Sequence, residues 1–257
     1  MILDTYSELS GIDIFDEASI CKIWAYKDVL PSSKTSLFNH FIKQATERRT
    51  RFNTEGLSFT HNNEKIKLLG KETRHNYIKI WDLISYPEYY YQTADTVKEW
   101  AKKQLTRDHP PALRMLADII AEHAEPLKNE DVLPLRFFIN VFPGGEPMAI
   151  HHDGLMHQLN IDLEEKDMWS ATYYLQMPKQ GGELWFPKTD FRYKPEVNSL
   201  VIFNGNKFKH GVRASAHDDC DRISITIRYT KISDMFWPGH PDKFLYKPDL
   251  EVLQAMQ

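Results

Sequence analysis

The segment that follows Phe142 carries residue types that bind metal ions. Residues 143–154 read Pro-Gly-Gly-Glu-Pro-Met-Ala-Ile-His-His-Asp-Gly, a turn followed by two histidines and an aspartate. On a regular strand residues i and i+2 share a face, so His151 and Asp153 point together while His152 points away. An imidazole and a carboxylate on one face can converge on a single metal ion. We therefore expect His151 and Asp153 to be ligands, with His152 as the rival of His151.

A third ligand must come from a distant strand, and His210 in the run Phe-Lys-His-Gly-Val is the candidate. Two neutral imidazoles and one carboxylate leave three coordination positions open, the arrangement typical of non-haem iron(II) oxygenases. Zinc is the competing metal. Zinc hydrolases with this ligand set usually carry both histidines on one helix as H-E-x-x-H, a pattern absent from the sequence. Iron is therefore the preferred metal for His151, Asp153 and His210.

A second cluster lies in residues 221–228, which alternate strictly between polar and apolar types. On a strand one face would carry Arg222, Ser224, Thr226 and Arg228, and the other Ile223, Ile225 and Ile227. Arginines that face a barrel interior require an anion. Arg222 can form a bidentate pair with a carboxylate, and Ser224 can add a hydroxyl donor. For Arg228 two roles stay open: binding the same anion, or an ion pair near Asp153.

The elements that must position these residues begin near residue 135. Short aromatic and β-branched runs follow there, separated by Pro-Gly, Gly-Gly and Asn-Gly pairs. We expect strands over 135–142, 169–177, 183–186, 198–203 and 222–230. Many short strands with regular turn signals predict an all-β barrel or jelly roll.

The region before residue 132 has a different texture. We expect helices over 16–30 and 93–105 and a third that opens at the Pro110-Pro111 pair, with a half-buried strand over 77–82. The third helix has one apolar face: Leu113, Leu116, Ala117, Ile120 and Ala124. No linker separates the two regions, so we expect one domain. Residues 1–132 would form a mostly helical support, 133–235 the β core, and 236–257 an extended tail with a short last helix.

Composition narrows the function classes. The 257 residues carry a net charge of −4 and a pI of about 6.3, which disfavours nucleic acid and anionic membranes as partners. Cys21 and Cys220 lack the C-x-x-C spacing of a thiolate site. There is no apolar run that could serve as a signal segment or a membrane span, so we expect a cytoplasmic protein. A small-molecule substrate is the expected partner, and the sequence leaves the oligomeric state open.

Together these motifs resemble the iron(II)- and 2-oxoglutarate-dependent oxygenase superfamily, especially its prolyl-hydroxylase-like branch. The pattern of that branch is H-x-D, a Gly-Gly-Glu-Leu segment, a distal histidine and a basic residue about ten positions further on. In this chain the resemblance runs from about Phe137 to Thr230. The matching residues are His151, Asp153, Gly181, Gly182, Glu183, Leu184, His210 and Arg222.

The resemblance implies a double-stranded β-helix with packing helices. It implies that His151, Asp153 and His210 bind iron(II), that Arg222 and Ser224 bind the distal carboxylate of 2-oxoglutarate, and that dioxygen is consumed. The expected reaction is hydroxylation of a C–H bond of a small polar metabolite such as an amino acid, which gives succinate and CO2, with ascorbate as an optional reductant. Halogenating relatives have a small residue in place of the carboxylate ligand, so an aspartate argues against halogenation.

Three alternatives stay open. One is a peptidyl hydroxylase of the prolyl type. Another is a nucleic-acid demethylase, because the Arg-x-Ser-x-Thr-x-Arg run is similar to the signature of alkylation-repair dioxygenases. That signature has Asn where this chain has Ser224, and those enzymes need a basic groove. The last is a non-enzymatic cupin-like binding module, which would share the barrel but would have no need of Arg222.

Overall fold

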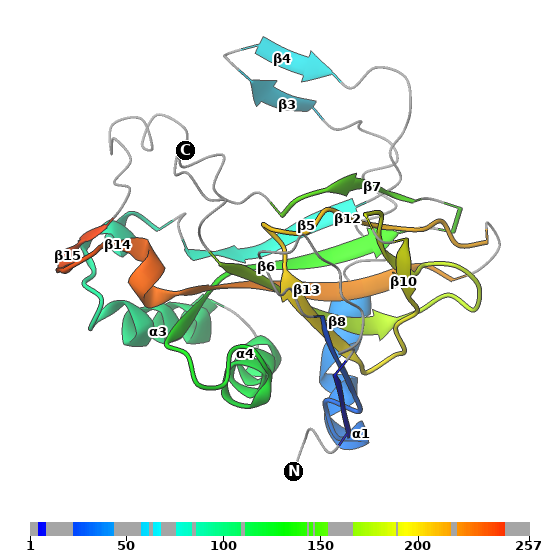
Figure 1. Ribbon diagram of the computed structural model, residues 1–257, viewed down its shortest axis with the longest axis horizontal. Coiled ribbons are helices and arrows are strands. Elements are labelled where there is room, and N and C mark those ends of the chain that lie inside the picture. The colour runs from blue at the N-terminus through cyan, green and yellow to red at the C-terminus, as the bar shows by residue number, and fades with distance from the viewer. Residues whose placement is uncertain are drawn as a thin grey trace.

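The computed structural model describes residues 5–8, 23–43, 58–61, 64–67, 76–83, 86–108, 111–142, 144–145, 147–153, 167–188, 190–216 and 220–244. Two facing β-sheets form its centre, and helices lie against the larger one (Figure 1). Within these residues no helix is both long and apolar enough to cross a membrane.

The larger sheet has seven antiparallel strands, and β13 lies near its middle between β8 and β6 (Figure 1). All five predicted strands are confirmed, four of them in this sheet and the one over 183–186 in the smaller sheet, as is the strand predicted over 77–82. In spatial order the strands are β1 (Thr5–Glu8), β2 (Trp24–Lys27), β11 (Leu200–Asn204), β8 (Met168–Gln176), β13 (Arg222–Lys231), β6 (Val132–Phe142) and β5 (Asn76–Asp82).

The smaller sheet has four antiparallel strands and faces the larger one. Its spatial order is β10 (Phe191–Tyr193), β9 (Leu184–Phe186), β12 (His210–Val212) and β7 (Met148–His151). Two short hairpins complete the described strands: β3 (Ser58–His61) with β4 (Glu64–Lys67), and β14 (Phe236–Trp237) with β15 (His240–Phe244). Two facing antiparallel sheets form a jelly roll, so the predicted double-stranded β-helix is confirmed.

Successive side chains of a strand point to opposite faces of the sheet, so the larger sheet has buried side chains on both faces. Between the two sheets a small apolar cluster contains Leu184 and Phe186 from β9 and Phe203 from β11. On the opposite face, Ile225 and Ile227 of β13 belong to the larger cluster, which also includes the helices. The isoleucines of β13 therefore face the helical layer, and the polar residues of β13 face the smaller sheet.

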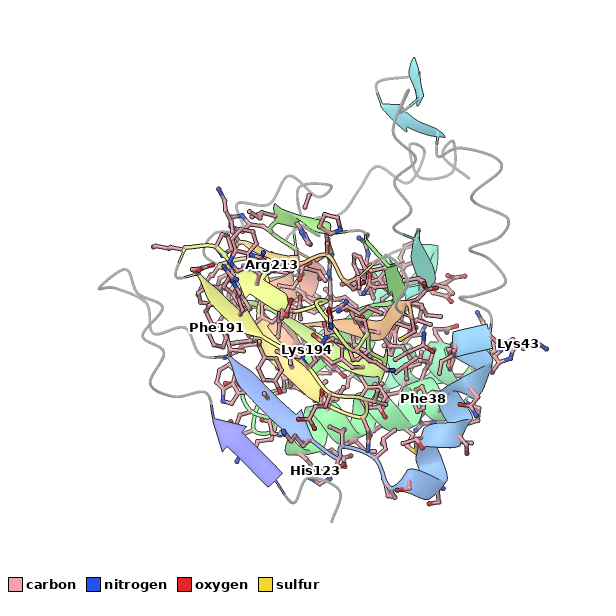
Figure 2. All side chains as sticks on the ribbon, turned by 90° about the vertical axis from the view of Figure 1, so that its right-hand side faces the viewer. Phe38, Lys43, His123, Phe191, Lys194 and Arg213 are labelled. Carbon is pink, nitrogen blue, oxygen red and sulfur yellow. The ribbon has the colours of Figure 1, made fainter. Side chains whose placement is uncertain are left out.

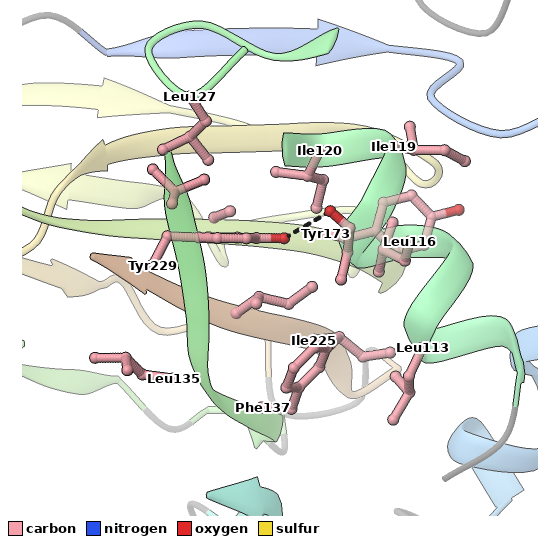
Figure 3. Packing of buried hydrophobic residues seen from close by; sticks show 14 of the residues in the cluster. Leu113, Leu116, Ile119, Ile120, Leu127, Leu135, Phe137, Tyr173, Ile225 and Tyr229 are labelled. Carbon is pink, nitrogen blue, oxygen red and sulfur yellow. Dashed lines mark hydrogen bonds between the residues drawn. The ribbon is translucent and has the colours of Figure 1, made fainter. Parts of the chain in front are cut away.

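The helical layer consists of α3 (Val97–Asp108) and α4 (Pro111–His123), which lie side by side under the larger sheet (Figure 1). The predicted apolar face of α4 is confirmed, with Leu113, Leu116 and Ile120 fully buried against the sheet (Figure 3). The Tyr229 hydroxyl of β13 donates a hydrogen bond to the carbonyl of Ala117 at 3.1 Å, which ties the strand to the helix. The shorter helical segments are α1 (Ser32–Thr35), η1 (Ser36–Phe38), η3 (Pro87–Tyr91) and η5 (Ile232–Met235).

Packed side chains extend this core to both ends of the sheets (Figure 2). Phe38, on the helical segment near α1, packs against Tyr173 of β8 with ring centroids 5.5 Å apart. Phe191, on the edge strand β10, stacks on Phe186 at 6.1 Å. Phe186 also meets Phe203 of β11 edge-on with ring centroids 5.2 Å apart, so an aromatic contact joins the smaller sheet to the larger one.

The predicted helix over 16–30 is wrong at residues 24–27, which form β2 and pair with both β1 and β11. Trp24, Ala25 and Tyr26 are all buried, and a short continuous apolar run fits a buried strand as well as a helix. Its pairing with β11, far along the chain, decides between the two. Residues 16–22 and the expected last helix after residue 244 lie outside the described residues, and the single-domain organisation stays a prediction.

Candidate active site

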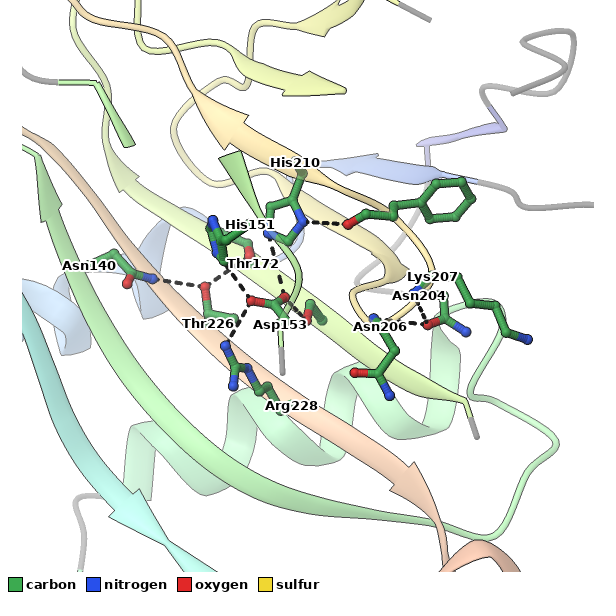
Figure 4. Close-up of polar contacts among 12 residues, drawn as sticks. Asn140, His151, Asp153, Thr172, Asn204, Asn206, Lys207, His210, Thr226 and Arg228 are labelled. Carbon is green, nitrogen blue, oxygen red and sulfur yellow. Dashed lines mark hydrogen bonds and ion pairs between the residues drawn. The ribbon is translucent and has the colours of Figure 1, made fainter. Parts of the chain in front are cut away.

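The three predicted metal ligands come together between the two sheets (Figure 4). His151 is the last residue of β7, and His210 is the first residue of β12 and its direct antiparallel partner. Their ring centroids are 4.5 Å apart. Asp153 follows β7 by two residues. One ligand atom from each side chain lies within 4.8 Å of the others, as a shared ion requires.

Backbone carbonyls set the orientation of both imidazoles. The Nδ1 of His151 lies 2.9 Å from the carbonyl of Ala149, and the Nδ1 of His210 lies 3.0 Å from that of Phe208. A carbonyl only accepts, so each Nδ1 carries the proton and each neutral ring directs the lone pair of Nε2 inward. Such a second contact is the usual support of a metal-binding histidine.

The two inward nitrogens face the carboxylate of Asp153. His151 Nε2 lies 3.5 Å from one of its oxygens, and His210 Nε2 lies 3.6 Å from the other. A neutral Nε2 presents a lone pair to a negative oxygen, which is repulsive until a cation lies between them. Two imidazoles and one carboxylate are also the donor set that suits iron(II). The residues present therefore fit a divalent metal ion.

Metal binding needs neutral histidines and a charged carboxylate, and the surroundings shift the pKa values of the three side chains in different directions. Burial lowers the pKa of His210, which keeps it neutral. Burial also acts against a charged His151, but hydrogen bonds to Asp153 and to the Ala149 carbonyl outweigh it and raise the pKa of His151. Burial would raise the pKa of Asp153, yet the charge of Arg228 and the neighbouring histidines hold it well below its usual range.

Arg228 takes the second of its two expected roles, that of an ion-pair partner. Its Nη2 donates to Oδ1 of Asp153 at 2.7 Å, and both side chains are buried. The guanidinium also lies over the ring of Phe138, with its carbon 5.1 Å from the ring centroid. The guanidinium of Arg228 is therefore directed at Asp153, one of the three metal-ligand candidates.

Arg222 lies on the same face of β13 but has a different environment. Its guanidinium carbon lies 5.1 Å from the centre of the Phe142 ring and 4.9 Å from that of Tyr174. Its polar contacts are long, at 3.5 Å to the Ser224 hydroxyl and 3.4 Å to the Tyr174 hydroxyl, and among the described residues its buried Nε, like that of Arg228, has no hydrogen-bond partner. Among the described residues no carboxylate pairs with it. A buried cation held this way fits an anionic ligand.

Both sites belong to one pocket, which is lined by the three metal-ligand candidates together with Arg222, Ser224 and Arg228. The larger sheet supplies a polar floor in which the Thr226 hydroxyl accepts a hydrogen bond from Asn140 and shares one with Thr172, both at 2.9 Å. The smaller sheet supplies an apolar wall. That wall contains Met148, Leu184 and Val212.

Sequence reasoning missed Tyr174, Asn140 and Thr172. The alternation of faces along a strand predicts that Tyr174 and Thr172 share one face of β8. It does not tell which face of β8 meets the pocket. His152, the rival ligand, is exposed and stands apart from the group of metal-ligand candidates.

Comparison with known proteins finds a family model that matches part of the chain. Residues 137–229 match the family model described as the 2OG-Fe(II) oxygenase superfamily. Among solved structures, the non-haem alpha ketoglutarate dependent carbocyclase SnoK from nogalamycin biosynthesis aligns with a TM-score of 0.50 at 12% identity, over 88% of this chain and 89% of that one. This likeness supports the double-stranded β-helix fold.

Two further structures align less closely. AviO1 from Streptomyces viridochromogenes Tue57 gives a TM-score of 0.49 at 13% identity, over 81% of this chain and 89% of that chain. A Pseudomonas putida prolyl-4-hydroxylase gives 0.42 at 16% identity, over 81% and 92%. No curated protein matches the sequence. Residues 137–229 are thus similar to the 2OG-Fe(II) oxygenase superfamily, a family that uses iron(II), 2-oxoglutarate and dioxygen.

Proposed function

We propose that this protein is an iron(II)- and 2-oxoglutarate-dependent dioxygenase that hydroxylates a C–H bond. One observation carries the proposal. Two imidazole Nε2 atoms face one buried carboxylate in the same pocket that holds Arg222, a buried cation without a carboxylate partner among the described residues. A metal ion and an anion are what these two arrangements need, and the cosubstrate of the family is a dianion that binds its metal.

Each side chain has a proposed task. His151, Asp153 and His210 would hold iron(II). Arg222 and Ser224 would bind the far carboxylate of 2-oxoglutarate, and the Tyr174 hydroxyl, already 3.4 Å from Arg222, would help to orient the guanidinium. When bound, iron(II), 2-oxoglutarate and dioxygen supply an oxidant strong enough to cleave an unactivated C–H bond, with succinate and CO2 as coproducts.

The walls of the pocket support a water-excluding role for the rest of the chain. Leu184 and Val212 are buried on the side of the smaller sheet, and Phe203 packs edge-on against His210 with ring centroids 4.6 Å apart. Exclusion of water strengthens the electrostatic interactions that hold charged ligands. Because Asp153 occupies the carboxylate position, hydroxylation is proposed in preference to halogenation.

The proposed substrate is a small polar metabolite such as an amino acid. The pocket combines an apolar wall with the polar groups of Asn140, Thr172 and Thr226, and the chain has a net charge of −4. That charge gives no general attraction for a nucleic-acid backbone. A peptide substrate is the nearest competing class.

The test measures succinate formation with iron(II) and ascorbate across free amino acids, peptides and methylated oligonucleotides. Succinate that depends on one class of substrate supports the enzyme and names its class. Arg222→Ala should abolish most of this activity, while Ser199→Ala, which removes a buried hydroxyl bonded to the carbonyl of Glu196, should retain it. Wild-type protein that binds neither iron(II) nor 2-oxoglutarate in calorimetry would overturn the proposal in favour of a binding module.

A further inference from the structure

Asp153 lies beyond the end of β7, so strand pairing does not fix its direction. Its backbone N–H donates instead to the carbonyl of Gly205 at 2.9 Å, in the turn that follows β11. Gly205 is itself anchored, because its N–H donates to the carbonyl of Met168 at 2.9 Å. The backbone of Asp153 is therefore fixed to the larger sheet, opposite the smaller sheet that carries the two histidines.

The side chain of Asp153 is held at both of its oxygens. Arg228 donates to Oδ1 at 2.7 Å, and the hydroxyl of Ser170 donates to Oδ2. Arg228 of β13 and Ser170 of β8 are direct cross-strand partners, and both are buried. Two neighbouring donors on the larger sheet therefore set the rotation of the carboxylate that faces the imidazoles; Figure 4 shows the contact of Arg228 with Asp153.

Gly205 leaves the space that this arrangement needs. A Cβ atom added at Gly205 would lie 2.5 Å from Oδ2 of Asp153 and 2.6 Å from the hydroxyl of Ser170, closer than Cβ contacts in proteins allow. The requirement is one of space, because a side chain there would occupy the position of the carboxylate. Ser170, Gly205 and Arg228 thus surround Asp153 from three strands or turns.

The turn that contains Gly205 is supported in its own right. The Asn204 side chain accepts hydrogen bonds from the backbone N–H groups of Asn206 and Lys207, both at 3.2 Å. Its amide donates to Asp167 at 2.7 Å, and the Lys207 ammonium donates to the same oxygen at 2.7 Å. A turn braced at this level can keep Gly205 in place against Asp153.

We propose that Ser170, Gly205 and Arg228 form a carboxylate cradle that positions Asp153 as a metal ligand and thereby sets metal affinity without touching the metal. The inference rests on the proposed function, since it requires the three predicted ligands to bind a divalent ion. Partners that orient a ligand in this way typically contribute 10- to 100-fold in metal affinity.

For Arg228, electrostatics alone predicts the opposite effect on metal affinity. The positive charge of Arg228 next to the site repels a divalent cation, so its removal would strengthen metal binding if charge were the main effect. Loss of orientation would weaken binding instead. Ser170 is uncharged and reports orientation alone. The cradle is therefore separable from a simple charge effect.

The test is the Kd of Co²⁺, used as a probe for iron(II), measured by calorimetry together with the visible absorption of the Co²⁺ complex. Arg228→Gln and Ser170→Ala should each raise the Kd about 10- to 100-fold and alter the absorption bands, because the geometry of ligation changes. Arg228→Lys keeps a donor with charge and should fall between Arg228→Gln and wild type. Ser199→Ala, a buried serine away from Asp153, should leave the Kd unchanged.

Gly205→Ala provides an independent steric test. It should raise the Kd at least as much as Ser170→Ala does, because the added methyl group displaces the carboxylate. Melting temperatures identify any variant that is unfolded, and Ser170→Ala, the smallest change, then carries the test. Tighter Co²⁺ binding by Arg228→Gln, or wild-type binding by Ser170→Ala, would overturn the cradle. If wild-type protein binds no divalent metal at all, the proposed function fails instead.

Discussion

Arg222 and Arg228 lie on the same face of β13, and each guanidinium lies over a phenylalanine of β6, with the carbon 5.1 Å from the ring centroid. Their polar partners differ. Arg228 has the carboxylate of Asp153 at 2.7 Å, whereas the nearest polar contacts of Arg222 are hydroxyl groups at 3.4 and 3.5 Å. A buried charge without a partner is costly, by several kcal/mol. The comparison shows that the charge of Arg228 is paired with a carboxylate of the chain, whereas that of Arg222 has no carboxylate partner among the described residues; the buried Nε atoms of both lack a partner there.

The largest effect should come from Asp153→Gly, which leaves Arg228 as unpaired as Arg222. Hydroxylation should collapse because the anionic metal ligand is lost. The free energy of unfolding should fall by about 3–5 kcal/mol, since a buried cation loses its partner. Coupled succinate assays and urea denaturation measure the two effects. Asp190→Gly is the matched control, because Asp190 is exposed and has a φ of 52° that glycine adopts without strain. A wild-type rate for Asp153→Gly would exclude this residue as a ligand.

The next largest effect should come from Arg222→Ala, measured as the KM for 2-oxoglutarate. A charge-assisted carboxylate contact contributes about 1.5–3 kcal/mol, so the KM should rise about 10- to 150-fold. Arg222→Lys should recover only part, because the ammonium keeps the charge and loses the fork. Metal affinity without cosubstrate should barely change.

Arg228→Ala is the counterpart that sharpens this comparison. Its loss should act on the melting temperature and on metal binding rather than directly on 2-oxoglutarate. The two alanine variants are therefore compared for cosubstrate KM at saturating metal. A sharp rise in KM for Arg228→Ala beside an unchanged value for Arg222→Ala would reverse the two assignments, and that of Ser224 with them.

A smaller effect is expected from pH, which acts on the metal end of the pocket. The pKa of His151 is raised and that of His210 is lowered, so His151 takes up the first proton as the pH falls. Protons and metal compete for its Nε2, so metal affinity should be constant in the alkaline range and fall about tenfold per pH unit once His151 protonates, starting above the usual histidine value of about 6.5. Metal titrations from about pH 5 to 8 check this. A flat profile would remove the histidines from the ligand set.

The smallest effect should come from Tyr174→Phe. Its hydroxyl is 3.4 Å from Arg222, a long hydrogen bond, while its ring continues to pack against the guanidinium. Loss of one such contact amounts to about 0.5–1.5 kcal/mol at most, so the KM for 2-oxoglutarate should rise about two- to tenfold. Equal effects of Tyr174→Phe and Arg222→Ala would mean that the phenol, rather than the arginine, is the main anion-binding group.

The sequence predicts those parts of the site that one strand can specify alone. The alternation of residues 222–228 gave the correct face for Arg222 and Ser224, because the side-chain period of a strand is two whatever its neighbours are. His151 and Asp153 do lie close together, but Asp153 lies just past β7, so contacts with Arg228 and Ser170, and not the strand period, direct its side chain. The start and the apolar face of α4 were equally local, since its apolar residues recur at helical spacing.

The partners across strands could not be predicted in this way. Ser170 contacts Asp153 because β8 pairs with β13 in a particular register, and Tyr174 reaches Arg222 through the same pairing. Register between strands depends on packing over the whole sheet. The strand at residues 24–27 was missed for a related reason, because its partner β11 lies far along the chain. Gly205 gave no signal beyond that of an ordinary turn.

The ion pair of Arg228 with Asp153 joins residues 75 positions apart in the chain. Contacts of such long range form late in folding, because the loop between them must close before the pair can contribute. The metal pocket should therefore appear only after β13 and the residues that follow β7 have come together, and isolated fragments of the β core should lack it. The time at which Co²⁺ absorbance appears during refolding would then report when the two sheets have closed completely.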